Sequence, residues 1–244
     1  MISKIATKLI RFVKKDFSYS ISPEIEGKNL TPFLVLRFFS LLRGYYWRRR
    51  FKSCGKWLFV GKGAKMRCPG KITAGRGVTI DEGVTINALS FKGVELGNYV
   101  TIRAGSIIEC SGVLNYIGEG IKIGNNTGIS QYAFIGARGF ITIGDNVLIG
   151  PRVTIYSENH VFRDPNELIY RQGVSRKGIN IGDDVWIGTG VTILDGVTVG
   201  RGSVIAAGAI VTRDIPEYSI AVGIPARVVR SRRRTNRENE GSVD

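Results

Sequence analysis

The sequence predicts an all-β solenoid of short strands, preceded by a basic helical segment. An aliphatic residue recurs at every sixth position from Ile181 to Val211, and a second series of mostly small apolar residues follows four positions later. Glycine occurs 32 times in 244 residues, roughly twice its usual share of about 7 %, which indicates many tight corners. Apolar residues make up 43 % of the chain, which is enough for a core.

The period of six excludes the two ordinary patterns. A helix repeats its apolar residues about every 3.6 positions and an isolated amphipathic strand every second one. The repeat over residues 72–225 instead fits short strands joined by corners that always turn the same way, with aliphatic side chains stacked inward. We expect the glycines that directly follow inward residues to need a backbone conformation that a side chain would hinder. They are Gly97, Gly124, Gly144, Gly150, Gly182, Gly188 and Gly200.

The basic charge belongs to the two ends of the chain. Residues 1–56 hold thirteen Lys or Arg against three acids, and residues 227–244 hold six against three, so +10 and +3 of the total of +15 lie there. No zinc-finger spacing or RNA-recognition signature accompanies this charge, so nucleic acid is not a predicted partner. An anionic membrane surface or a phosphate-rich cofactor fits the ends better.

Two helices are predicted within the N-terminal domain, residues 1–56. Residues 2–15 form a basic amphipathic helix. A second helix runs from Thr31, as N-cap, and Pro32, as first helical residue, to Trp47. That second helix is shorter than the about twenty residues of a membrane span. The segment either packs over the open end of the solenoid or lies on an anionic bilayer, which the run Tyr45 to Arg50 supports.

Cysteine usage bears on the compartment. Cys54, Cys68 and Cys110 are odd in number and form no C-x-x-C pair, which argues against a disulfide framework and a zinc site. Charges interrupt the first apolar residues, unlike a secretory signal. We expect a cytoplasmic protein that requires no metal. If the N-terminal segment lies on a bilayer and does not cap the solenoid, residues 1–56 contact the inner face of the cell membrane.

The single histidine, His160, lies where the period breaks, between Ile155 and Ile181. Loops on rigid scaffolds often carry function. Imidazole, whose ordinary pKa is about 6.5, suits a side chain that takes up a proton near neutral pH. His160 is therefore the predicted general base. Glu158 and Asn159 either help to orient the imidazole or the acceptor, or are solvated loop residues.

The Ile-Gly-x-x-Val-x hexapeptides resemble the left-handed parallel β-helix of the hexapeptide-repeat acyltransferases, whose triangular coils each use three hexapeptides. The resemblance implies a β-helix domain over residues 57–225, followed by a basic C-terminal segment and mobile tail over residues 226–244. The segment from Tyr156 to His160 resembles the catalytic loop of maltose and galactoside O-acetyltransferases and their polysaccharide-modifying relatives. No cysteine adjoins His160, which favours direct transfer in a ternary complex.

The C-terminal repeats resemble the coenzyme A segments of the same group, which implies acetyl-CoA as donor. Trp186 would flank the reacting centre, and the backbone of Thr189 and Ala207 would bind the pantetheine arm. Thr212 and Arg213 would meet the nucleotide end.

Two further arginines, Arg227 and Arg230, match the family's residues for the 3′-phosphate, a group that the planar fork of arginine suits. The family also implies a homotrimer, in which one chain supplies the histidine loop and the next completes the donor cleft. The chain departs from the group at residues 127–132 and in its longer basic N-terminal segment. Both differences favour a lipid-linked or polymeric saccharide as acceptor.

Other users of this fold fit less well. A γ-class carbonic anhydrase needs three histidines, and a nucleotidyltransferase needs an additional nucleotide-binding domain. The sequence therefore predicts an O-acetyltransferase of a sugar or surface-polysaccharide precursor. An amino-sugar N-acyltransferase is the runner-up, followed by a non-catalytic scaffold at the membrane.

Overall fold

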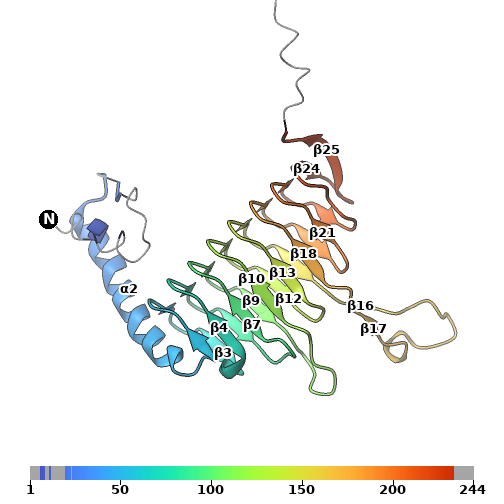
Figure 1. The fold of residues 1–244 in the computed structure, drawn as a ribbon, viewed down its shortest axis with the longest axis horizontal. Coiled ribbons are helices and arrows are strands. Elements are labelled where there is room, and N and C mark those ends of the chain that lie inside the picture. Colours follow the sequence, from blue (N-terminus) through green and yellow to red (C-terminus); the bar gives the residue numbers. More distant parts are fainter. Residues whose placement is uncertain (1–5, 9–10, 12–19, 23, 234–244) are drawn as a thin grey trace, which may run out of the picture.

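The computed structural model describes residues 6–8, 11, 20–22 and 24–233 of the chain. Its body is a stack of triangular coils in which each coil gives one strand to each of three parallel sheets (Figure 1). The predicted left-handed parallel β-helix with an N-terminal helical extension is confirmed. The C-terminal tail, residues 234–244, and most of the helix predicted over residues 2–15 lie outside the described residues.

Three sheets, here called A, B and C, form the sides of the triangle. Sheet A contains β1 (Ser53–Cys54), β4 (Ile72–Ala74), β7 (Val94–Leu96), β10 (Ile121–Ile123), β13 (Ile141–Ile143), β18 (Ile179–Ile181) and β21 (Thr198–Val199). Sheet B contains β2 (Phe59–Val60), β5 (Thr79–Ile80), β8 (Thr101–Ile102), β11 (Gly128–Ile129), β14 (Leu148–Ile149), β19 (Trp186–Ile187), β22 (Val204–Ile205), β24 (Ser219–Val222) and β25 (Arg227–Ser231). Sheet C contains β3 (Lys65–Arg67), β6 (Thr85–Asn87), β9 (Ile107–Glu109), β12 (Phe134–Gly136), β15 (Thr154–Tyr156), β20 (Thr192–Leu194) and β23 (Ile210–Val211).

The core is a column of aliphatic side chains that runs along the axis of the coils. Register is kept from coil to coil, so that Ile121 lies beside Ile141 and Ile141 beside Ile179. All three side chains are buried, as is the whole predicted series from Ile181 to Val211. The six-residue period is therefore the spacing of inward positions around one triangle.

The glycines after inward residues are required for a different reason from the one predicted. At Gly97, Gly124 and Gly188 the backbone does not take the left-handed conformation. Instead, a Cβ at Gly97 would lie 2.7 Å from the carbonyl carbon of Gly124, and one at Gly188 would lie 2.6 Å from the nitrogen of Ala207. These positions exclude a side chain because consecutive coils touch there. Positive φ angles fall elsewhere in the corners, for example at Asn126 and Asn146.

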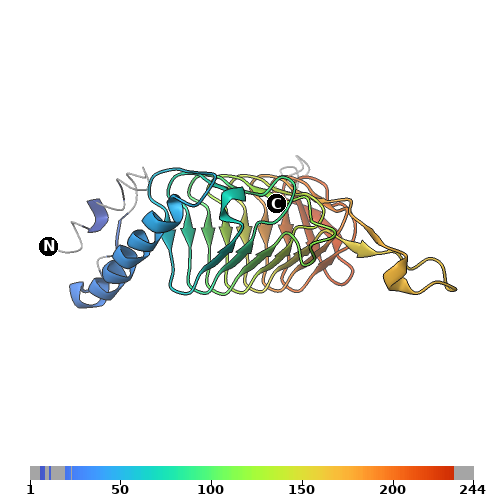
Figure 2. The same cartoon turned by 90° about the horizontal axis from the view of Figure 1, so that it is seen from below.

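The helix α2 (Gly27–Arg48) lies at the N-terminal end of the stack (Figure 2). It begins four residues before the predicted N-cap, so the assignment of Thr31 as N-cap was wrong. Thr31 is helical, and its hydroxyl donates to the carbonyl of Gly27 at 2.9 Å. Burial of Leu30 holds the additional turn, and Pro32 lies inside the helix, where its missing N–H costs one hydrogen bond. Among the described residues, we find no helix with the length and apolar content of a membrane span.

Candidate active site

The predicted break in the repeat is an arm that projects from the stack. Residues 157–178 leave between β15 of sheet C and β18 of sheet A (Figures 1 and 2). Two short antiparallel strands, β16 (Asn159–His160) and β17 (Val174–Ser175), form its stem, with His160 opposite Val174. The side chains of Asn159 and His160 are exposed. The histidine thus stands on a defined hairpin and is accessible to solvent.

Both legs of the arm are tied to the coils at its base. Ser157 is fully buried, and its hydroxyl donates to the carbonyls of Gly136 at 3.0 Å and Gly139 at 2.7 Å. On the returning leg, the backbone N–H groups of Lys177 and Gly178 donate to the carboxylate of Asp195 at 3.0 and 2.9 Å. The arm therefore begins and ends at fixed points.

A buried ion pair joins the two legs immediately below His160. Arg176 Nε donates to Glu158 Oε2 at 2.8 Å, and the side chains are only 12 % and 8 % exposed. Arg176 also donates to the carbonyl of Ile117 at 2.9 Å, and its guanidinium lies 4.0 Å from the ring centroid of Tyr116. Glu158 is therefore a buried structural partner and not a solvated loop residue.

Sequence reasoning missed Arg176 and the loop that holds it. The loop lies between β9 and β10, around Tyr116, where the inward series is also interrupted. That second interruption was the signal that could have indicated it. The contact between Arg176 and Ile117 joins residues 59 positions apart in the chain, so no local sequence motif predicts it.

The tip of the arm exposes apolar side chains. Gln172 closes it by donating to the carbonyls of Asp164 and Glu167, both at 2.8 Å. Four large apolar residues around this closure are exposed: Phe162, Leu168, Ile169 and Tyr170. Exposed apolar surface of this kind on an ordered projection is typical of a contact with another molecule.

Three of the predicted donor residues lie on sheet B and at the corner between sheets B and C. Trp186 pairs with Leu148 on one side and Val204 on the other, and its ring is exposed. Thr189 and Ala207 occupy the following corner in successive coils, where the N–H of Gly208 donates to the carbonyl of Thr189 at 2.8 Å. Within the described residues, the N–H groups of Thr189 and Ala207 donate no hydrogen bond.

The remaining predicted donor residues divide between two places. Thr212 and Arg213 follow β23 at the corner between sheets C and A, which is the corner where the arm leaves. Arg227 and Arg230 lie on β25, which pairs antiparallel with β24 at the end of sheet B. All four side chains are exposed.

The structure therefore brings the predicted residues together as two groups. His160 shares one edge of the triangle with Arg213, whereas Trp186 and Thr189 lie across sheet C from them. A cavity of about 280 Å³ lies between α2 and the first coil, and one of about 470 Å³ lies against sheet A. Neither of these two cavities is lined by His160 or Trp186.

Comparison with known proteins supports the fold and the repeat. The model for the bacterial transferase hexapeptide (six repeats) matches residues 178–213. A Mycobacterium tuberculosis protein named as a probable acetyltransferase is 33 % identical over 210 residues, 85 % of this chain and 61 % of that protein. The galactoside O-acetyltransferase of Escherichia coli is 40 % identical over 132 residues, 54 % of this chain and 64 % of that enzyme.

Solved structures give the same fold. A variant of AntD, an N-acyltransferase from Bacillus cereus in complex with dTDP-4-amino-4,6-dideoxyglucose and coenzyme A, matches with a TM-score of 0.54 at 22 % identity. The match covers 81 % of this chain and 92 % of that one, and it shows the shared fold. The chain spans less than two thirds of the curated relatives' own length, at 61 % and 64 %. Residues 178–213 therefore carry hexapeptide repeats of the bacterial transferase type, and the chain is similar in sequence to named acetyltransferases and in fold to a solved N-acyltransferase.

Proposed function

We propose that this protein transfers an acetyl group from acetyl-CoA to a hydroxyl of a saccharide, with His160 as general base. The observation that carries the proposal is the arm. It interrupts the stack of coils, both of its legs are anchored, and it presents the chain's single histidine to solvent. Named acetyltransferases among the relatives support the reaction class.

In the proposed reaction the acceptor oxygen attacks the thioester carbonyl carbon while His160 removes the hydroxyl proton. The tetrahedral intermediate then collapses, the carbon–sulfur bond breaks, and the proton passes to the departing coenzyme A sulfur. General base catalysis of this kind contributes about 100- to 10,000-fold. Glu158 acts through Arg176 as a positioning residue, since its carboxylate is already bound to the guanidinium. Asn159, exposed on the same strand, would contact the acceptor from beside the histidine.

The donor residues present suit acetyl-CoA. The unpaired N–H groups of Thr189 and Ala207 can donate to the amide carbonyls of the pantetheine arm. Arg227 and Arg230 supply cations at the end of sheet B for the 3′-phosphate. Trp186, exposed on β19, would lie beside the acetyl group.

The two groups of residues require a second copy of the chain. Because sheet C separates His160 from Trp186, the complete site needs the arm of one chain against sheet B of another. The exposed apolar tip around Tyr170 gives that arm a surface for such a contact. We therefore propose a homotrimer in which Thr212 and Arg213 come from the chain that supplies His160. An equimolar mixture of His160→Ala and Trp186→Ala chains, refolded together, should regain activity that neither has alone. If the mixture is no more active than either variant alone, the proposal that two chains share each site would be contradicted.

The proposal also concerns which group of the acceptor, a hydroxyl or an amine, receives the acetyl group. The similarity to a galactoside O-acetyltransferase favours a hydroxyl. The fold shared with an N-acyltransferase that binds a dTDP-linked amino sugar makes an amine the alternative. The basic N-terminal end supports an acceptor that is lipid-linked or polymeric.

One assay separates these possibilities. The purified protein is incubated with acetyl-CoA and with matched acceptors, a hexose glycoside and the corresponding amino sugar, and release of free thiol is followed. Faster release with the hydroxyl acceptor supports O-acetylation, and faster release with the amine supports the alternative. Acetyl-CoA should also raise the melting temperature. If the protein neither releases thiol nor shows a thermal shift with acetyl-CoA, the result would favour a non-catalytic scaffold.

A further inference from the structure

Helix α2 packs on the β-helix with its polar side. Helices on protein surfaces usually bury an apolar stripe. In α2, Arg37 donates to the hydroxyl of Thr79 at 2.9 Å and lies 3.8 Å from the ring centroid of Phe59. Arg43 donates to the carbonyl of Val60 at 2.8 Å. The side that faces sheet B therefore carries these two arginines beside buried Ser40 and Gly44, and the partly buried Trp47 packs against the core near the end of the helix.

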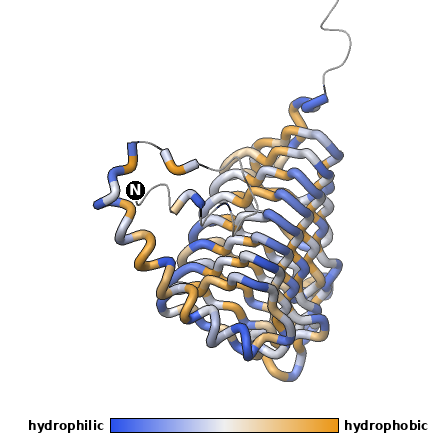
Figure 3. The backbone as a smooth tube through the Cα atoms, turned by 60° about the vertical axis from the view of Figure 1, so that its left-hand side comes forward, coloured by the Kyte–Doolittle hydropathy of each residue, from blue (hydrophilic) through white to orange (hydrophobic). Residues whose placement is uncertain are grey.

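The opposite side of α2 is apolar and uncovered by the described residues. Its exposed side chains, here called the apolar face, are Val35, Phe38, Phe39, Leu42, Tyr45 and Tyr46. Figure 3 shows that much of the α2 segment consists of hydrophobic residues. The helix cannot rotate to bury the apolar face, because Gly44 packs against the backbone of Leu58, and a Cβ at Gly44 would lie 1.8 Å from the Leu58 carbonyl oxygen.

The same end of the molecule carries a strong excess of cations, although Glu26 caps α2 and pairs with Lys28, and Asp81 follows directly after β5. Residues 27–80, which include α2 and the first coil, contain thirteen Lys or Arg and no Asp or Glu. Residues 81–233 contain fifteen against fourteen. Arg49 and Arg50, at the C-terminal end of the apolar face, lie 4.5 and 4.4 Å from the ring centroids of Tyr45 and Tyr46. Aromatic and basic side chains therefore contact each other at the C-terminal end of the apolar face.

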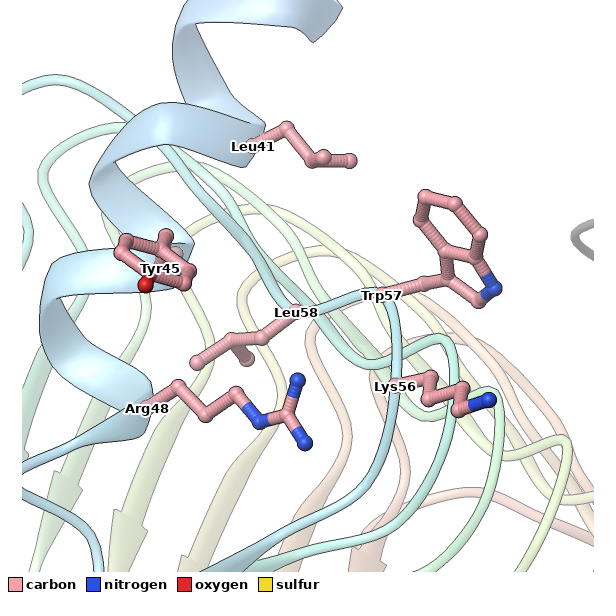
Figure 4. Close-up of a pocket in the computed structure, with 7 residues that line it drawn as sticks. Leu41, Tyr45, Arg48, Lys56, Trp57 and Leu58 are labelled. Carbon is pink, nitrogen blue, oxygen red and sulfur yellow. The ribbon is translucent and has the colours of Figure 1, made fainter.

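A cavity of about 280 Å³ continues this surface between α2 and the first coil (Figure 4). Leu41, Tyr45 and Leu58 line it with apolar atoms, and Arg48 and Lys56 bring two cations to it. Apolar walls with cations beside them suit a phosphate head group joined to an acyl chain.

We propose that α2 lies flat in the interface of an anionic phospholipid bilayer, with its apolar face among the acyl chains and the arginines at its C-terminal end, Arg48 to Arg50, at the phosphates. A helix with an apolar face and basic flanks binds in this way. A nucleic acid would need the cations but not the apolar face. A second copy of the chain would bring two surfaces of strong net positive charge together and is disfavoured by their repulsion. The proposal concerns binding and does not depend on the proposed acetyl transfer.

Vesicle sedimentation of the full chain tests the apolar part. The protein should sediment with vesicles of phosphatidylcholine and phosphatidylglycerol and stay in solution with phosphatidylcholine alone. Phe38→Ser/Leu42→Ser should weaken binding at least about 10-fold, because two side chains would no longer enter the acyl region. The matched control, Val228→Ser/Val229→Ser, removes exposed apolar residues of β25 at the other end and should bind like the natural protein.

Charge variants test the second part. Arg49→Gln/Arg50→Gln should weaken binding to the anionic vesicles about 30-fold, and added salt should weaken binding by the natural protein. Lys122→Gln/Arg233→Gln, which removes exposed cations elsewhere, should change it little. The proposal is overturned if the natural protein fails to sediment, or if the α2 variants bind as well as their controls. It is also overturned if Phe38→Ser/Leu42→Ser lowers the mass measured by light scattering, since α2 would then join copies of the chain.

Discussion

Glu158 and Arg176 form a buried ion pair, 2.8 Å long, that clamps the two legs of the arm immediately below His160. The pair connects the arm to the loop around Tyr116, two coils earlier in the stack, through the carbonyl of Ile117. The position of the His160 backbone therefore depends on contacts away from the proposed site. The stack and the clamped hairpin hold that backbone in place, and the imidazole is exposed to solvent.

Breaking this pair should reduce both stability and turnover. We expect Glu158→Gln to lower the free energy of unfolding by about 3 kcal/mol, because the charge of Arg176 stays buried without its counterion. The turnover number should fall about 10- to 100-fold while the KM for acetyl-CoA stays constant, since misplacing a reacting group costs rate. Urea unfolding and steady-state kinetics measure the two effects.

The matched control is an exposed ion pair on the same arm. Arg171 and Glu167 lie 3.9 Å apart in solvent, so Arg171→Gln should cost less than about 1 kcal/mol. Equal losses for Glu158→Gln and Arg171→Gln would show that the buried clamp contributes nothing special.

Replacement by alanine should destabilise the protein at Gly97 but hardly at Gly128. A Cβ at Gly97 would lie 2.7 Å from backbone of the next coil, whereas at Gly128 nothing lies within 4 Å. Gly97→Ala should lower the free energy of unfolding by about 2 kcal/mol through overpacking. Gly128→Ala should change it by less than about 1 kcal/mol. Thermal or urea unfolding of both variants checks the contact explanation, and a tolerated Gly97→Ala would contradict it.

The stack could be predicted from sequence because one contact repeats at each coil. An inward residue such as Ile141 meets its counterpart Ile179 in the next coil, so the period alone carries the information. The clamp could not be predicted in this way. Arg176 and Ile117 meet only because coils stack, and each looks like an ordinary loop residue in the sequence.

The start of α2 was misplaced for a related reason. The Thr31–Pro32 pair is a common helix start, but burial of Leu30 favours one more turn before it. The glycines after inward residues were predicted from their own backbone conformation, whereas the structure explains them by contact with the next coil. In each case the missing information was a contact with another part of the chain.

The donor assignment predicts a selective effect at Arg227. Arg227→Ala should raise the KM for acetyl-CoA more than the KM for its dephospho analogue, because only the former carries the 3′-phosphate. Lys122→Ala, which removes an exposed cation from β10, should alter neither. Equal increases in KM for both donors would show that Arg227 does not bind the 3′-phosphate.

The three cysteines should differ in reactivity. Burial raises the pKa of the Cys110 thiol to about 12 and also raises the pKa of Cys54, whereas Cys68 is exposed. Because the thiolate is the reactive form, Cys110 should stay unmodified at pH 8 until the protein unfolds. A thiol-specific chromogenic reagent should show a fast phase that Cys68→Ser abolishes. Rapid modification of Cys110 in the folded protein would contradict its position in the core.

The most direct measurement is the turnover number of His160→Ala at saturating acetyl-CoA with the preferred saccharide acceptor. The side chain is exposed, so the melting temperature and the thermal shift with acetyl-CoA should match those of the natural protein. Turnover should fall at least about 100-fold, because no other group would take the acceptor proton. Turnover at the natural rate would contradict the account, since the arm would then present no catalytic base.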